Sequence, residues 1–388
     1  MRIVDIKEMS VGISSSMRNA VIDFSEMTVS VVAMVSDAVV DGEPLVGYGF
    51  NSNGRYAPSE VIRRRLAPRV LAADPDELLD PAGLLEPAQV AAAAMRNEKP
   101  GGHGERAVAA GVLDMAAWDL RAKLENRPLW RTIADRVGND DARPAVPVYA
   151  AGGYYHPRGG TSALVDELSG YLALGYTDVK MKIGGADLAT DVARIEAVLA
   201  ALPEGGTLAV DANGRFDLRR AVEVGGALES YDLRWYEEPC DPLDYAAMAA
   251  LADVYEGPLA TGENLLSSQD ALNLLRHGGM RPGHDVLQMD PVLSYGLVDY
   301  LRTARHLTRH GWSLGDCWPH GGHQFNLHIA AGLGLGGIES YPGLFEPFGG
   351  FADDEPVHEG IVTVGDGPGI GFERAARLEP VLDKVRTS

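Results

Sequence analysis

The chain has 388 residues, of which 46% are hydrophobic and 23% charged, and its formal net charge is −21. This length exceeds one ordinary hydrophobic core, so two domains are expected. The acidic excess argues against nucleic acid or an anionic membrane as a partner, and no apolar run reaches the roughly 18 residues that cross a bilayer. An anionic substrate would have to meet a local island of cations or metal.

The start of the chain, MRIVDIKEMSVGI, does not resemble a secretory signal, because Asp5, Lys7 and Glu8 interrupt its apolar residues. The two cysteines, Cys240 and Cys317, are therefore expected to be free thiols in a reducing compartment. These features predict a cytoplasmic protein.

Two patterns follow one another along the chain. Residues 1 to about 60 mix short alternating strands with turn-rich loops, and residues 60 to 140 show apolar residues at helical spacing, which predicts an α+β part. From about residue 146, short β-rich segments alternate with Ala- and Leu-rich helical segments at a period of about 26 to 30 residues. The predicted strands of this second part are 146–153, 178–184, 208–214, 233–239, 258–264, 285–291, a weak 312–320 and 334–342. About eight such units fit a closed (β/α)8-type barrel better than an open sheet.

Nearly every predicted barrel strand ends in an ionisable residue followed by Gly, Pro or Asn. In chain order these residues are Lys182, Asp211, Glu237, Glu263, Asp290, His320 and Glu339. Barrel active sites are built at the carboxyl ends of the strands, whereas an open sheet would use only its switch point. The pattern therefore favours a barrel with its active site at that mouth.

Three of these residues are carboxylates spaced by 26 and 26 residues, namely Asp211, Glu237 and Glu263. One strand–helix unit separates each pair, so the three should lie on neighbouring strands, where their repulsion calls for a divalent cation. Oxygen ligands alone suit Mg²⁺. The alternative is that each carboxylate merely caps the following helix. Glu238 is a rival to Glu237, although strand alternation puts Glu238 on the other face.

Lys180 and Lys182 lie two residues apart in the strand DVKMKIGG, so both side chains point to one face. A neighbouring metal ion and poor solvation should lower the pKa of Lys182, which would make it a base, and Lys180 can screen a substrate carboxylate. The alternative is two lysines that reach water at a strand end.

His320 follows the weak strand, across the predicted barrel mouth from Lys182, and Asp290 ends the strand before it. A carboxylate beside a histidine fixes the tautomer and raises the pKa, which suits a general acid. His323 and His328 compete for this role. A base and an acid on opposite sides of a metal-bound carboxylate predict α-proton abstraction through an enediolate that Mg²⁺ and Lys180 stabilise.

The run GLGLGG matches G-x-G-x-x-G, but a predicted helix precedes it and a strand follows, the reverse of a dinucleotide site. The glycines are expected to lead into the last barrel strand.

The K-x-K pair, the Asp/Glu/Glu triad and the Asp–His pair resemble, in that order, the enolase superfamily in its mandelate racemase subgroup. Within it, the chain is most similar to the D-tartrate dehydratase family. The segments that carry this resemblance include RNAVIDF, GYGFNSNGRY, NEKPGGHGER, YAAGGYY, KMKIGG, AVDANGRF, WYEE, ATGEN, PHGGHQ, AAGLGLGG and ESYP.

The resemblance implies a modified (β/α)7β barrel with an α+β capping domain. The implied domains are residues 1–140 for the cap, 141–349 for the barrel, and 350–388 for a C-terminal segment that packs back on the cap. It also implies a homo-oligomer that acts on a small-molecule substrate.

The implied reaction is Mg²⁺-dependent dehydration of a hydroxy-diacid, D-tartrate to oxaloacetate. In it Lys182 is the base, His320 the acid and Asp290 its orienting partner, and the triad binds Mg²⁺. The implied substrate contacts are Asn19, Asn53, Lys99 and Glu339, and Lys180 is a further expected contact because it can screen a substrate carboxylate. The sequence departs from the family at His156, which stands in place of an aromatic residue and is counted as a candidate contact that could change specificity. The alternatives are a dehydratase or racemase for another acid sugar on the same scaffold, and a non-catalytic anion-binding protein.

Overall fold

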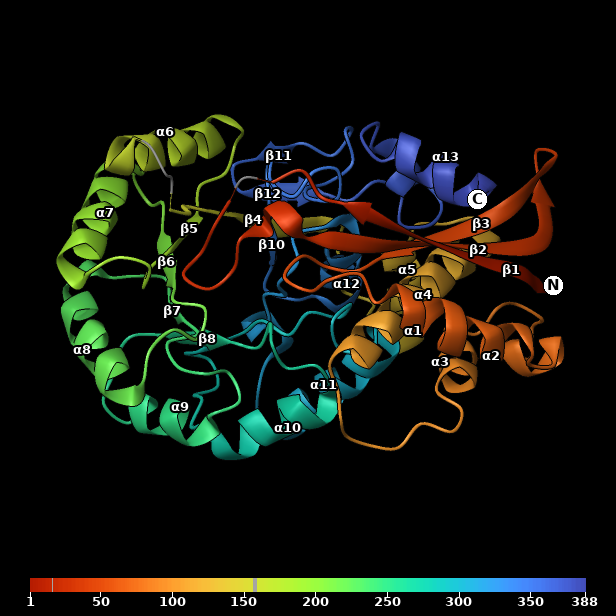
Figure 1. Ribbon diagram of the computed structural model, residues 1–388, viewed down its shortest axis with the longest axis horizontal. Helices are drawn as coiled ribbons and strands as arrows, with labels where there is room; N and C mark the ends of the chain where they lie inside the picture. Colours follow the sequence, from red (N-terminus) through yellow and green to blue (C-terminus); the bar gives the residue numbers. More distant parts are fainter. Residues whose placement is uncertain (16, 156–158) are drawn as a thin grey trace.

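The computed structural model describes residues 1–15, 17–155 and 159–388. It contains a three-stranded antiparallel sheet and a nine-stranded sheet whose core is parallel. In Figure 1 the parallel strands lie inside an arc of helices, and the three-stranded sheet with its own helices lies beside them, toward the N-terminus. This is the predicted barrel with a capping domain.

The cap sheet consists of β1 (Ile3–Gly12), β2 (Thr28–Val40) and β3 (Glu43–Phe50), in that order. Asp41 and Gly42 join β2 to β3 with φ values of 52° and 87°, as the two central residues of a tight hairpin turn require.

Helix α4 packs directly on β3, because β3 carries glycines where the two approach. A Cβ atom at Gly47 would lie 2.1 Å from the carbonyl oxygen of Ala116, and one at Gly49 would lie 2.3 Å from that of Val112. The cap helices are α1 (Ser59–Val61), a π turn η2 (Ile62–Leu66), α2 (Ala67–Leu71), α3 (Pro87–Ala94), α4 (Glu105–Leu124) and α5 (Leu129–Val137), with short 3₁₀ turns at η1 (Phe24–Glu26) and η3 (Pro75–Leu78).

The barrel strands are short and pair in parallel from one to the next. They are β4 (Ala145–Gly152), β5 (Val179–Lys182), β6 (Leu208–Asp211), β7 (Tyr236–Glu237), β8 (Leu259–Thr261), β9 (Val286–Leu287) and β10 (Ile338–Ser340), and β10 pairs with β4.

Helices follow the strands around the outside. They are α6 (Gly160–Ala173), α7 (Leu188–Ala201), α8 (Leu218–Leu228) with the 3₁₀ turn η4 (Glu229–Tyr231), α9 (Tyr245–Ala252), α10 (Ser268–His277), α11 (Leu297–Arg309) and α12 (Gln324–Leu333). The side chains of Asp187, Asp217, Asp244 and Ser267 cap α7 to α10. The capping role considered for the strand-end carboxylates is therefore filled by other residues.

The weak strand predicted at 312–320 is wrong. Its first half is a 3₁₀ turn, η5 (Leu314–Asp316), because Ser313 and Asp316 form a reciprocal capping box. The following residues run along β9 without making a regular strand: Cys317 forms a single bridge to Leu287, and the His320 N–H donates to the Gln288 carbonyl at 3.2 Å.

On its other side this segment meets β10, where the Glu339 N–H donates to the Pro319 carbonyl at 3.3 Å. The segment 317–320 thus takes the seventh strand position and closes the barrel. With β4 to β10 it gives the eight positions of a (β/α)7β barrel. The glycine run 332–337 leaves α12 and enters β10, and there Gly336 and Gly337 pack against Trp318.

The C-terminal residues contact both sheets. Two short strands, β11 (Val357–His358) and β12 (Ile361–Thr363), extend the barrel sheet, where β12 pairs antiparallel with β4. A 3₁₀ turn, η6 (Phe372–Arg374), precedes α13 (Glu379–Thr387), which packs against β1 and β2. The domain limits at 140 and 349 stay a prediction.

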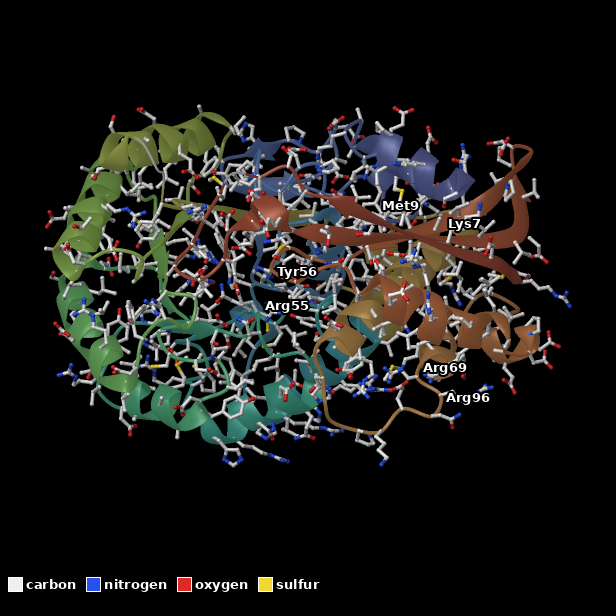
Figure 2. The ribbon with its side chains drawn as sticks, in the orientation of Figure 1. Lys7, Met9, Arg55, Tyr56, Arg69 and Arg96 are labelled. Atoms are coloured by element: carbon white, nitrogen blue, oxygen red, sulfur yellow. The ribbon has the colours of Figure 1, made fainter. Side chains whose placement is uncertain are left out.

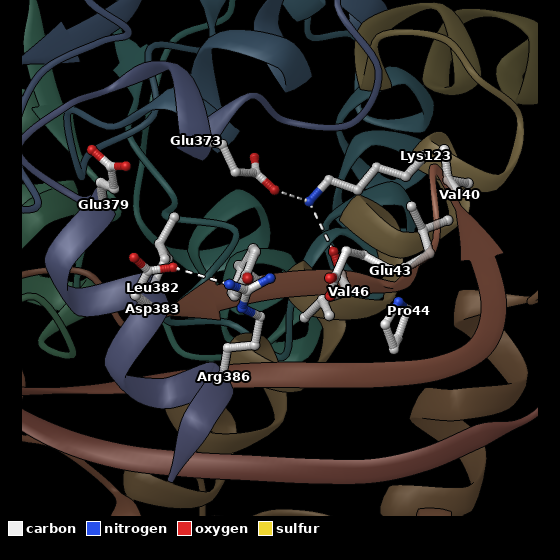
Figure 3. A pocket seen from close by; sticks show the side chains of 12 residues that line it. Val40, Glu43, Pro44, Val46, Lys123, Glu373, Glu379, Leu382, Asp383 and Arg386 are labelled. Atoms are coloured by element: carbon white, nitrogen blue, oxygen red, sulfur yellow. Dashed lines mark hydrogen bonds and ion pairs between the residues drawn. The ribbon is translucent and has the colours of Figure 1, made fainter.

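Between α13 and the β2–β3 hairpin lies a cavity of about 370 Å³ (Figure 3). At its wall the Lys123 ammonium donates to the Val46 carbonyl at 2.9 Å and to Glu373 at 2.5 Å.

Cys240 and Cys317 are buried free thiols. Among the described residues, none of the helices has the length and apolar character needed to cross a membrane.

Candidate active site

The register of the parallel strands brings the strand-end residues to one level. Lys182 pairs with Asp211, and Asp211 pairs with Glu237. Glu263 follows β8 after Gly262, whose φ is 137° and where a Cβ atom would lie 2.7 Å from the Met289 nitrogen. The chain therefore turns closely over the neighbouring strand before Glu263, a path that only glycine takes without strain.

One oxygen from each of Asp211, Glu237 and Glu263 lies within 4.8 Å of the other two. Burial and repulsion from Asp211 raise the pKa of Glu237 to about 8. For Asp211, burial is outweighed by Lys182 and Lys180, which lower its pKa to about 2. Carboxylates this close disfavour one another's ionised form. Three converging carboxylate oxygens are also the kind of ligand set that Mg²⁺ prefers.

The sign of the charge at the mouth supports a cation site. Three cationic groups among the described residues, Lys180, Lys182 and His320, face six carboxylates, which are Asp211, Glu237, Glu238, Glu263, Asp290 and Glu339. A divalent cation would favour the ionised form of these carboxylates and offset most of the negative excess that they carry when ionised.

Glu238 does not join the converging oxygens. Its backbone has a φ of 38°, which ends the strand alternation, and its carboxylate accepts hydrogen bonds from Asn264 Nδ2 at 3.0 and 2.8 Å. Burial, with repulsion from Glu263 and Asp211, raises its pKa well above the ordinary value. Alternation placed Glu238 away from the site, but the left-handed turn keeps it beside Glu263.

Both lysines are buried rather than directed to water, so the strand-end alternative is wrong: Lys180 is 1% and Lys182 4% exposed. Lys180 Nζ lies 2.5 Å from Glu237 and 2.7 Å from Glu339, and Lys182 pairs with Asp211.

The expected lowering of the Lys182 pKa depends on a neighbouring metal ion and stays a prediction, because the protein groups alone act in the opposite direction. Burial alone would lower the pKa, but the attraction of Asp211 outweighs burial and raises it. The same holds for Lys180, whose pKa is raised because Glu237 and Glu339 outweigh burial. Among the protein groups alone, Asp211, Glu237 and Glu339 therefore favour the charged form of both ammonium groups.

His320 Nδ1 lies 3.0 Å from Asp290 Oδ2, which places Nε2 toward the mouth, 3.6 Å from Glu263 and 3.9 Å from Glu339. Burial opposes a charged imidazole, but Glu263, Glu339 and Asp290 outweigh it and raise the His320 pKa to about 9. The ring can thus carry a proton on Nε2 at neutral pH while Asp290 fixes its orientation.

The two competing histidines are placed for packing. Burial lowers the His323 pKa to about 4, and this ring stacks edge-on to Phe50. His328 accepts the Trp130 N–H at 3.2 Å, and Nε2 lies 2.9 Å from the Ile370 carbonyl oxygen, so the ring is neutral with its proton on Nε2. Neither ring is paired with a carboxylate as His320 is.

The predicted substrate contacts fall in different places. Glu339 lies in the cluster between Lys180 and His320, and Asn53, 9% exposed, lies beside Gly321. Asn19 uses its side-chain oxygen to accept the N–H groups of Val21 and Ile22, so with respect to the described residues its amide nitrogen is the group left for a ligand.

Lys99 is exposed and lines a separate cavity of about 460 Å³ between the cap and helices α10 and α11. None of the strand-end residues lines that cavity, so within one chain the structure does not bring Lys99 to the mouth. His156 lies outside the described residues. The roles of Lys99 and His156 stay predictions.

Several polar residues at the mouth were missed from the sequence. Trp235 and Gln288 donate to Glu237 Oε2 at 2.9 and 2.8 Å, and the Tyr341 hydroxyl donates to Glu339 at 2.7 Å. Arg55 and Asn264 form a further connection beside Glu263. A usable signal existed for some of them, because Gln288 and Tyr341 lie two residues from a strand-end carboxylate and share its face.

Comparisons with known proteins agree with this geometry. Residues 163–377 match the family described as Enolase C-terminal domain-like. A 3,6-anhydro-alpha-L-galactonate cycloisomerase of Streptomyces coelicolor is 31% identical over 72% of this chain and 73% of its own. An arabinonate dehydratase of Saccharolobus solfataricus is 28% identical over 69% of this chain and 71% of its own.

Solved structures show the same fold. An L-talarate dehydratase from Polaromonas sp. JS666, complexed with Mg and L-glucarate, superposes with a TM-score of 0.74 and 25% identity over 94% of this chain and 93% of its own. A racemase from Streptomyces coelicolor A3(2) with bound magnesium superposes with a TM-score of 0.76 and 24% identity over 96% of this chain and 98% of its own. The chain belongs to the enolase superfamily, in the subgroup of mandelate racemase and muconate lactonizing enzyme.

Proposed function

We propose that the protein is a Mg²⁺-dependent hydro-lyase that dehydrates an acid sugar. The observation that carries this proposal is the convergence of Asp211, Glu237 and Glu263 between Lys182 and the His320–Asp290 pair. The dehydratase names of several relatives and the Mg in solved structures of similar fold support it.

The carboxylate triad would hold the Mg²⁺ ion. When bound, this ion neutralises the buried carboxylates and polarises a substrate carboxylate, which makes the neighbouring C–H bond more acidic. Lys180, already paired with Glu237 and Glu339, adds a fixed positive charge on the same side.

Lys182 and His320 come from the second and seventh of the eight strand positions, so they approach a substrate at the mouth from different sides. Once the charge of Asp211 is offset, Lys182 Nζ can lose its proton to solvent and then remove the α-proton, and the electron pair forms a C=C bond as the β-C–O bond breaks. His320 Nε2 gives a proton to the departing hydroxyl, which leaves as water. The enol that remains becomes a 2-oxo acid.

Within this class we propose a hydroxy-diacid, with D-tartrate to oxaloacetate as the specific case to test. L-talarate and galactarate, which name a Salmonella typhimurium relative 28% identical over 70% of this chain, are also diacids. The case for tartrate rests on the resemblance of the loops that carry Asn19 and Asn53.

The second candidate is another acid-sugar reaction of the same intermediate, such as racemisation, epimerisation or cycloisomerisation. The cycloisomerase relative, at 31% identity, favours keeping it. In that case a proton returns to carbon and no water is lost.

The test is a panel of mono- and diacid sugars, including D-, L- and meso-tartrate, incubated with enzyme and Mg²⁺ in D₂O. A 2-oxo acid, trapped with semicarbazide, supports dehydration, and deuterium in recovered substrate without water loss supports the second candidate. No product from any tartrate would remove the tartrate proposal alone. Binding without turnover, unchanged by Lys182→Met, would overturn catalysis altogether.

A further inference from the structure

We propose that Arg55 is a positioning residue that couples the cap to the metal site, acting through Asn264 on the third carboxylate, Glu263. The inference rests on the proposed function, because it takes Glu263 as a metal ligand. It assigns a role to a residue of the cap loop that follows β3.

Arg55 crosses from the cap to the barrel. Its NH2 group donates to Asn264 Oδ1, and its NH1 group donates to the Gly54 carbonyl oxygen at 2.7 Å, which holds the guanidinium against its own loop. Figure 2 labels Arg55 and Tyr56 in the middle of the molecule, between the cap strands and the barrel helices.

The side-chain amide of Asn264 hydrogen-bonds to two kinds of partner. Its nitrogen donates to both oxygens of Glu238 and to Glu263 Oε1 at 3.3 Å, while its oxygen accepts from Arg55. A side-chain amide can turn over, which would put its oxygen against two carboxylates. Among the described residues, Arg55 is the donor to Asn264 Oδ1. Arg55 therefore fixes the orientation of the Asn264 side-chain amide.

Glu263 is the carboxylate that most needs this support. Its side chain is 15% exposed, against 0% for Asp211 and 1% for Glu237. Glu237 is held by Trp235 and Gln288 in addition to Lys180.

Asp211 is likewise held by the Asn213 N–H at 2.8 Å and by Lys182. In the described part of the chain, the Glu263 side chain has two hydrogen-bond or ion-pair partners: Asn264, which donates to it, and His320 at 3.6 Å. Removing Arg55 should therefore loosen one metal ligand and leave the other two in place.

Partners behind a metal ligand orient it, and their loss costs about 10- to 100-fold in metal affinity. We therefore expect Arg55→Ala to weaken Mg²⁺ binding by at least about tenfold. In the same way, the bound ion should favour the cap-loop position in which Arg55 reaches Asn264, because such coupling is reciprocal.

The experiment measures Mg²⁺ affinity by titration calorimetry, without substrate, for wild type, Arg55→Ala, Asn264→Ala and the double variant. The expected result is a weaker affinity for both single variants and a double variant no weaker than Asn264→Ala alone. Arg55→Lys, which keeps a donor and the charge, should restore part of the loss. Arg215→Ala is the matched control, because Arg215 is an exposed arginine of the loop after β6 whose side chain makes no hydrogen bond or ion pair with the described residues.

Wild-type affinity in Arg55→Ala, or additive losses in the double variant, would overturn the coupling while the proposed function stands. Failure of the wild type to bind Mg²⁺ would overturn both. Melting temperatures of the metal-free variants show that affinity is compared between folded proteins, and Arg55→Lys serves if Arg55→Ala does not fold.

Discussion

Two regions of this protein that contain buried carboxylates, the barrel mouth and helix α4, satisfy them differently. On α4, Asp119 accepts the N–H groups of Tyr48 and Ile370 and pairs with Lys123. At the mouth, carboxylates face lysines and one another, and Glu263 is partly open to solvent. Fixed backbone donors indicate a structural carboxylate, whereas an uncompensated cluster indicates a place for a ligand.

Lys182→Met should have the largest effect on activity. Loss of the base is expected to lower kcat by roughly a thousandfold, within the range for general base catalysis. Turnover is measured with the best substrate of the acid-sugar panel. A retained rate, with the variant folded, would show that another group removes the proton.

Asp119→Asn should have the largest effect on stability. It leaves Lys123 short of a buried partner, so the free energy of unfolding should fall by about 3–5 kcal/mol, while the Mg²⁺ affinity of the folded protein is unchanged. Urea unfolding measures the first and calorimetry the second. Asp135→Asn, which breaks an exposed ion pair with Arg127, is the control and should cost at most about 1 kcal/mol. Equal losses of unfolding free energy in Asp119→Asn and Asp135→Asn would contradict the structural role of Asp119, on which the comparison of the two regions depends.

The stabilisation of the protein by Mg²⁺ should depend on the carboxylates of the barrel mouth and not on Asp119. Mg²⁺ at about a hundred times its dissociation constant should raise the free energy of unfolding by about 2.7 kcal/mol, and EDTA should reverse this. Glu263→Gln should lose most of the gain, and Asp119→Asn should keep it. If Glu263→Gln kept the gain in unfolding free energy, the ion would have to bind at another site.

The smallest expected effect is the acid sensitivity that His328 contributes. Burial lowers its pKa to about 3, whereas an unfolded chain has a histidine pKa of about 6.5. Below pH 6.5 the unfolded state binds a proton that the folded state does not, so stability falls as pH falls. The loss is about 1.4 kcal/mol per pH unit, or about 2 kcal/mol at pH 5. His328→Gln should flatten this slope between pH 7 and 5, and an unchanged slope would assign it to other groups.

The strand-end residues were predictable because a parallel barrel repeats one unit, which sets each carboxyl end at the same level. The period alone therefore placed Lys182, Asp211 and Glu237 together. It failed at 312–320, where a capping box outweighs the signal of the two tryptophans, and at Glu238, where a positive φ ends the alternation.

The loop residues could not be placed in this way. Arg55 reaches Asn264 across 209 positions of sequence, and that contact depends on how the cap sits over the barrel. Lys99 shows the reverse, since its motif pointed to the mouth but its loop lines another cavity. The fold follows from periodicity, and the support of the site depends on tertiary contacts.

The most direct measurement is anomalous diffraction from crystals grown with Mn²⁺ in place of Mg²⁺. The account predicts one strong peak at the barrel mouth, in contact with an oxygen from each of Asp211, Glu237 and Glu263. A peak held by other residues, or no peak at the mouth at a saturating concentration, would contradict it.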